Sequence, residues 1–224
     1  MRIRQKTLKT PEGRSHHLRN NIYCVVAIDT TGDNPKEHEI HQICIWLLDA
    51  VYIPSKKHMP FVFSIKPEKP VDFKTTSTLV GKLRDAGANG TDSFLVMDKL
   101  EEWFESLNLP EGGKIVPITF NWPKVRDFLT NWLPPLTYRY VFHRRYYIDL
   151  VSFLIFHNEY QAFHGKATVL LDDPDNEEND EHQKYLMLRK FGIEVGQSDD
   201  VMVRCIAYAK TFARLALFKF DCPV

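Results

Sequence analysis

The stretch YCVVAIDTTGDNP, residues 23–35, decides the fold. Its apolar run is typical of a buried strand, and the Thr-Thr-Gly that follows predicts a turn. The strand therefore delivers one carboxylate, that of Asp29, to the start of a turn. Ala27 stands two residues earlier and on the same face, because side chains alternate along a strand. Whether the protein is an enzyme depends on this apolar residue beside Asp29.

The composition is that of a soluble globular protein, with 224 residues, 44% of them hydrophobic and 26% charged. We expect a basic arm at residues 1–20, free in solvent or touching phosphates, and one domain at residues 21–224. The 29 basic and 29 acidic residues balance, so net charge alone does not indicate nucleic-acid binding. Neither a membrane span nor a secretory signal is visible, and we expect a cytoplasmic or otherwise intracellular protein with reduced cysteines.

Strand and helix patterns alternate along the chain, which is typical of an α/β sheet. The acidic segment 171–183 has almost no apolar residue and predicts a solvated loop, since a row of like charges repels rather than converging on a metal. The predicted strands are 22–28 and 40–48, forming a hairpin, then 60–67, 112–121 and a short one after residue 145; the predicted helices are 75–87, 92–107, 123–133, one ending near residue 160, 184–193 and 199–218.

Four blocks in this order resemble the DnaQ-like, or DEDD, 3′–5′ exonuclease family over roughly residues 20–217. The blocks are AIDTTGDNPKEHEIHQICIWLLD, FSIKPEKPV, VPITFNWPKVRDFL and LRKFGIEVGQSDDVMVRCIAYAKTF. The family's first block contains Asp-x-Glu-Thr-Thr-Gly, and its second has an Asn followed four residues later by an Asp. The resemblance implies a ribonuclease H-like fold, with a central mixed β-sheet flanked by α-helices.

Phosphodiester hydrolysis explains why such a family needs carboxylates at these places. Two divalent ions about 3.5–4 Å apart can activate the attacking water and stabilise the leaving oxygen. Such hard cations require oxygen ligands, so several carboxylates must converge from different elements. In the family, two come from the first strand, one from the helix after the Asn block and one from the last helix, with a His or Tyr as general base.

Most of these positions are not acidic here. Aligned on the Thr-Thr-Gly, only Asp29 and Asp200 correspond to family carboxylates; the other positions fall on Ala27, Val125 and, for the base, Val195 or Gly196. Asp127 lies two residues beyond Val125, about 200° around a helix, and should point away. The resemblance therefore implies a residual site, with no required cofactor or at most one weakly bound Mg²⁺ or Mn²⁺ on Asp29 and Asp200.

Structural roles compete with the functional ones. Asp29 is either a surviving ligand or a turn residue that accepts from the Thr31 or Gly32 amide. The sequence Ser198-Asp199-Asp200 favours a helix cap over a ligand role for Asp200. Asn121 is expected to tie two backbone segments together more readily than to touch a substrate.

The segment TYRYVFHRRYY, residues 137–147, interleaves arginines with aromatic residues, a pattern suited to single-stranded nucleic acid. The alternative is an Arg-rich loop running into a buried strand. The candidate nucleic-acid contacts are Arg139, Arg144, Arg145, Trp122 and Asn121.

Three hypotheses for function remain open. The first is a degenerate exonuclease fold, inactive or strongly impaired, that binds single-stranded nucleic acid or a nucleic-acid-processing protein. The second is an active metal-dependent 3′–5′ exonuclease on DNA or RNA, whose rearranged site uses Asp29, Asp200 and a further acid such as Asp149 or Asp199. The third is an assembly subunit without nucleic-acid contact.

Overall fold

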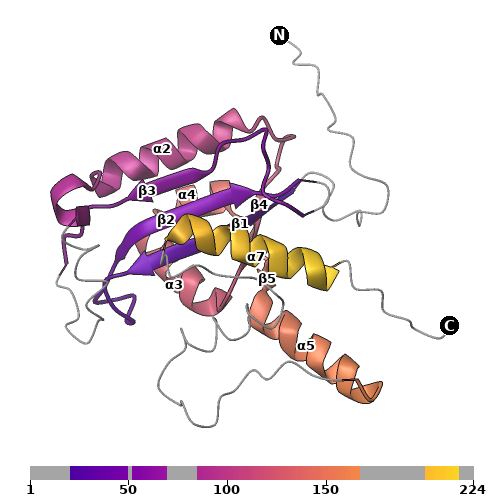
Figure 1. The fold of residues 1–224 in the computed structure, drawn as a ribbon. Helices are drawn as coiled ribbons and strands as arrows, with labels where there is room; N and C mark the ends of the chain where they lie inside the picture. The colour runs from indigo at the N-terminus through magenta and orange to yellow at the C-terminus, as the bar shows by residue number, and fades with distance from the viewer. Residues whose placement is uncertain (1–20, 50–51, 70–84, 167–199, 217–224) are drawn as a thin grey trace.

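The structure is a computed structural model that describes residues 21–49, 52–69, 85–166 and 200–216 (Figure 1). The predicted basic arm, the acidic segment 171–183, the predicted helix 184–193 and most of the predicted helix 75–87 lie outside these residues. Within them, no helix is long and apolar enough to cross a membrane.

A five-stranded mixed sheet forms the centre of the molecule, in the order β3-β2-β1-β4-β5. The predicted hairpin is confirmed, because β1 and β2 pair antiparallel, as do β2 and β3. The β1–β4 and β4–β5 pairs are parallel. The strands are β1 (Ile22–Thr30), β2 (Ile40–Leu47), β3 (Phe61–Ser64), β4 (Ile115–Thr119) and β5 (Ile148–Asp149).

Helices cover both faces of the sheet, because β1 is apolar on both of its faces. Cys24 and Val26 pack with α2, α3 and α4, whereas Val25 and Ala27 pack with α5 and α7. In Figure 1, α7 crosses in front of β1 and β2, and α3 and α4 lie behind the sheet. The helices are α2 (Ser93–Ser106), α3 (Trp122–Trp132), α4 (Pro135–Val141), α5 (Leu150–Phe163) and α7 (Val201–Ala216).

The predicted α/β class, with a mixed sheet between helices, is confirmed. The alternative of an Arg-rich loop running into a strand holds only for the later part of the Arg/Tyr segment, because residues 135–141 form the short helix α4 before the chain reaches β5. Pro135 at the first position of α4 explains this helix, since the fixed φ of proline suits the first turn of a helix. Within α2, Val96 is buried, whereas Leu95 is 48% exposed.

Candidate functional site

The end of β1 places Ala27 and Asp29 on the face covered by α7, as the alternation of the strand predicts. Ala27 is 2% exposed and lies opposite Cys44 of β2. It belongs to an apolar cluster that includes Val201 and Cys205 of α7. The position that carries the first acid of the resembled family is therefore part of the core between the sheet and α7.

Asp29 is bound by a cation from its own chain. Its carboxylate forms an ion pair with the guanidinium of Arg204 on α7. The side chains of Arg204 and Asp29 are only 6% and 11% exposed, so the pair is largely shielded from water. Removal of either partner would leave the other charge buried and uncompensated, which is strongly destabilising.

The turn that follows β1 is closed by hydrogen bonds between Thr31 and Glu39. The amide of Thr31 donates to the carbonyl oxygen of Glu39 at 2.9 Å, and the hydroxyl of Thr31 accepts from the Glu39 amide at 3.0 Å. A Cβ on Gly32 would lie 2.5 Å from the ring of His38. Thr31 and Gly32 therefore have structural roles in closing the turn that follows β1.

Asp200 caps α7, as one of its two predicted roles requires. Its Oδ1 accepts from the amide of Met202 at 2.8 Å, and its carbonyl oxygen accepts from the amide of Arg204 at 3.1 Å. Asp200 is exposed, whereas Arg204, one turn further along α7, is 5% exposed. The helix thus directs a cation, rather than a carboxylate, toward Asp29.

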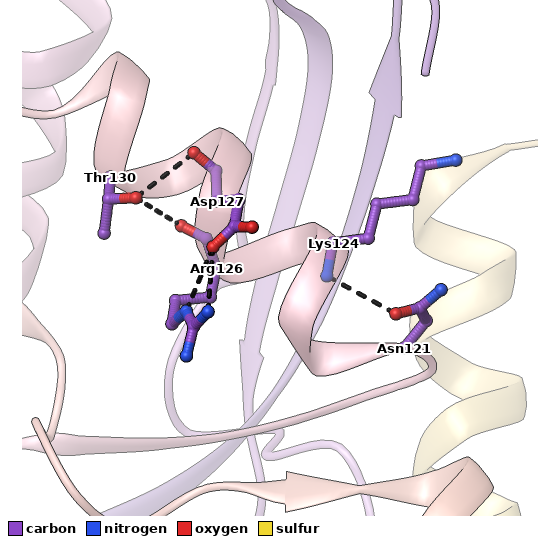
Figure 2. Close-up of polar contacts among 5 residues, drawn as sticks. All are labelled: Asn121, Lys124, Arg126, Asp127 and Thr130. Carbon is purple, nitrogen blue, oxygen red and sulfur yellow. Dashed lines mark hydrogen bonds and ion pairs between the residues drawn. The ribbon is translucent and has the colours of Figure 1, made fainter. Parts of the chain in front are cut away.

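The start of α3 is organised by Asn121, which has the left-handed φ of 55°. Its Oδ1 accepts from the amide of Lys124 at 3.4 Å (Figure 2), so Asn121 caps its own helix, and this bond does not tie two separate backbone segments together as was expected. Val125 is 7% exposed and packs in the core. Asp127, half exposed, accepts from the Nε and Nη2 of Arg126 at 3.1 and 3.0 Å (Figure 2), so its carboxylate is engaged at the surface, as predicted.

Asp149, the other acid considered for a rearranged site, has two backbone partners. Its Oδ1 accepts from the amide of Val151 at 2.9 Å and caps α5. Its Oδ2 accepts from the amide of Trp122 at 3.0 Å and joins the start of α3 to the start of α5. Asp199, Val195 and Gly196 lie outside the described residues.

Among the described residues, the candidate ligands do not fit a two-metal centre. Asp29 is neutralised by a guanidinium, Asp200 and Asp149 accept backbone N–H groups, and Ala27 and Val125 offer no ligand atom. Throughout the described ranges, no group of three or more His, Cys, Asp or Glu residues is placed to hold a metal ion.

The structure separates the candidate nucleic-acid contacts into two kinds. Arg139 on α4, Arg144, Arg145 and Asn121 are exposed. Trp122 is 2% exposed and stacks on Tyr147, with ring centroids 5.5 Å apart and planes 24° apart. Its indole is covered, so a direct base contact by Trp122, as predicted from the sequence, does not agree with its burial.

Arg204 is the residue that sequence analysis missed. A signal for it was present, because Arg204 lies three residues after Val201 and four before Tyr208 on the apolar face of the last helix. An arginine on a buried helix face requires a buried acid as its partner. Asp29, on the face of β1 that carries Ala27, could have been identified as that acid.

Comparison with known proteins was informative only at the level of structure. No family model matches the sequence, and no curated protein matches it. Cell-death related nuclease 4 (CRN-4) superposes with a TM-score of 0.60 at 18% identity, over 87% of this chain and 63% of its own. Exonuclease I of E. coli, in complex with a dT13 oligonucleotide, gives a TM-score of 0.61 at 15% identity, over 88% of this chain and 41% of its own.

A moderately thermophilic exonuclease I from Methylocaldum szegediense gives a TM-score of 0.56 at 14% identity, over 86% of this chain and 40% of its own. This chain therefore spans less than two thirds of the length of each of these nucleases. At such identities the likeness concerns the fold alone. The chain has the DnaQ-like exonuclease fold.

Proposed function

We propose that this protein is a catalytically inactive, or strongly impaired, chain of the DnaQ-like exonuclease fold that acts by binding single-stranded nucleic acid. The observation that carries the proposal is the buried ion pair between Arg204 and Asp29. A guanidinium stays protonated in proteins and has no open coordination position for water or a phosphate oxygen beside Asp29. It supplies charge compensation without the water activation that a metal ion would supply.

A metal ion is not part of the proposal. Asp29 and Asp200 were expected to hold at most one Mg²⁺ or Mn²⁺, and Arg204 now provides the positive charge that Asp29 requires. A divalent ion at Asp29 would have to displace or approach this guanidinium, and the repulsion between two buried cations opposes its binding.

Nucleic acid is the ligand that the fold and the surface favour. Exonuclease I, which shares the fold, is described in complex with dT13 and dA16 oligonucleotides. Arg139, Arg144 and Arg145 are exposed close together in sequence and can contact phosphates without any metal. A nucleic-acid-processing protein as the partner is the second possibility, and binding assays distinguish it from the first.

The test is a degradation assay on 5′-labelled single-stranded DNA and RNA with Mg²⁺ and with Mn²⁺. The control is the Asp29→Asn, Asp200→Asn double variant, which reports contaminating nuclease. The single Asp200→Asn variant, changed at an exposed position, guards against a double variant that fails to fold. We expect no cleavage above the control. Cleavage by the wild-type protein that both variants lose would overturn the proposal and favour the rearranged exonuclease.

A further inference from the structure

The segment His143–Tyr147 leaves the sheet between two contacts with β4. Phe142 forms a bridge with Ile115, and Ile148 pairs with Ile118 in the parallel β4–β5 register. The amide of His143 donates to the carbonyl oxygen of Ile115 at 2.7 Å. Both ends of the segment are therefore fixed to the same strand, and the residues between them project from the sheet.

His143 organises the first half of this segment. Its Nδ1 accepts from the amides of Arg145 and Tyr146, at 3.1 and 2.9 Å. Its ring stacks on that of Tyr146, with centroids 4.2 Å apart and planes 22° apart. Tyr146 nevertheless remains 39% exposed. One side of the Tyr146 ring is thus supported by His143, while part of the ring faces solvent.

Trp122 supports the second half. Its buried indole stacks on Tyr147, which is 49% exposed. The backbone of Trp122 is itself held, because its amide donates to Oδ2 of Asp149 at 3.0 Å. Tyr146 and Tyr147 are therefore two neighbouring aromatic rings with fixed supports, which lowers the entropy lost when a ligand stacks on them.

The positive charge of residues 143–147 favours a polyanion as the ligand over an uncharged apolar molecule or a cationic peptide. Arg144 and Arg145 are exposed and directly precede the two tyrosines, and residues 142–148 contain no acidic side chain. Exposed aromatic rings beside arginines are suited to single-stranded nucleic acid, in which unpaired bases stack and phosphates attract cations. Duplex bases are already stacked on each other and offer no free face to the tyrosines.

We propose that residues 143–147 are the contact site for single-stranded nucleic acid, with Tyr146 and Tyr147 stacking on bases and Arg144 and Arg145 contacting phosphates. This site rests on the proposed nucleic-acid-binding function. It lies on the loop before β5, whereas Asp29 and Arg204 lie between β1 and α7. Trp122 and His143 are positioning residues that support the tyrosines from within.

The experiment measures binding of fluorescein-labelled dT13 and rU13 by anisotropy across a series of salt concentrations. Tyr146→Leu and Tyr147→Leu are compared with Tyr146→Phe and Tyr147→Phe, which keep the aromatic ring. We expect each Leu variant to bind about 5- to 150-fold more weakly, the effect of losing one base–aromatic stack, and each Phe variant to bind like the wild type. Thermal unfolding of every variant checks that the fold is kept, and the Phe variants provide a readout even where a Leu variant unfolds.

The arginines are tested with a matched pair of surface cations. The Arg144→Gln, Arg145→Gln variant removes two charges from the segment, and the Lys210→Gln, Arg214→Gln variant removes two exposed charges from α7. We expect the first to reduce the slope of log K against log salt by about 1.4, the value for two single-strand phosphate contacts, and the second to leave it unchanged.

Two results would overturn the site, and they differ in what else they overturn. Wild-type binding that the Leu and Gln variants of the segment retain within twofold would remove this site and leave nucleic-acid binding elsewhere on the protein. No binding of either oligonucleotide by the wild-type protein at 50 mM salt would remove both the site and the proposed ligand, and would favour a protein partner.

Discussion

Arg204 has the largest consequence of any single residue described, because its guanidinium forms a buried ion pair with Asp29. Replacing it with Met leaves the Asp29 carboxylate buried without its cation. We expect a loss of about 3–5 kcal/mol in the free energy of unfolding. For a chain of this size, that corresponds to a fall of roughly 6–20 °C in Tm. Thermal unfolding followed by circular dichroism measures the effect.

Two further variants separate this buried charge effect from a general loss of side-chain packing. The Asp29→Leu, Arg204→Met variant removes both charges and should recover most of the lost stability, because a buried ion pair is often no better than apolar residues of similar volume. Lys124→Met breaks the exposed pair with Asp33, whose side chain is 92% exposed, and should cost less than about 1 kcal/mol. An Arg204→Met variant that loses no more stability than Lys124→Met would contradict a buried, uncompensated charge at Asp29.

Residues whose positions depend on near neighbours in the sequence could be predicted, whereas residues that contact distant parts of the chain could not. Ala27, Asp29 and Val125 were placed correctly because strand alternation and helix period depend on neighbouring positions. Arg204 meets Asp29 across 175 positions in the sequence, and no local period reports such a pair. Trp122 was predicted as a nucleic-acid contact, and its stacking on Tyr147 was missed for the same reason, since Tyr147 lies 25 residues later in the sequence.

At the scale of elements, the sheet was more predictable than the segment around α4. Strands β1 to β4 each carry an apolar run bounded by turn residues, which is a strong local signal, whereas β5 has only two residues. Residues 137–147 contain few of the usual markers, and their arginines and tyrosines fit a helix, a loop or a strand. The structure divides them between α4 and the loop at residues 143–147. The helix ends at Phe142, which forms a bridge with Ile115 of β4.

The loop at residues 143–147 should lose order in acid. Burial, followed by the charges of Arg145 and Lys114, lowers the pKa of His143 below its ordinary value of about 6.5. Because its Nδ1 accepts two amides, the neutral ring is the form that holds the loop. The unfolded chain therefore binds the proton more tightly, so this contribution to stability is complete above about pH 6.5 and falls as the pH is lowered through the depressed pKa.

His143→Asn provides the matched control for this pH dependence, because an Asn side chain can accept from the same following amides and does not titrate. We expect the Tm of the wild-type protein, relative to that of His143→Asn, to fall as the pH is lowered from 7.5 to 5. The other histidines are common to both proteins, so their titration cancels in this difference. A difference that stays constant, or grows in acid, would show that His143 does not hold the loop through its neutral ring.

At the scale of the whole molecule, side chains of α7 and β1 pack directly against each other. Val25 and Ala27 of β1 pack with Cys205, whose Sγ lies 3.5 Å from the carbonyl oxygen of Cys44, and Arg204 closes the end of this contact on Asp29. A metal that bound only the folded protein would raise its stability through mass action. Because the cation between these two elements is a guanidinium, we expect the folded state to gain no such stabilisation.

The fold and its binding activity should therefore be independent of divalent metal. Adding Mg²⁺ or Mn²⁺ at about 1 mM should leave the Tm of the protein unchanged relative to NaCl of equal ionic strength. At equal ionic strength, EDTA should leave the affinity of the protein for dT13 and rU13 unchanged, since arginines and tyrosines make the proposed contacts. A rise in Tm with Mn²⁺ that is lost in the Asp29→Asn, Asp200→Asn variant would contradict this expectation. It would show that the two carboxylates still bind a metal ion, and that the Arg204 guanidinium moves aside to admit it.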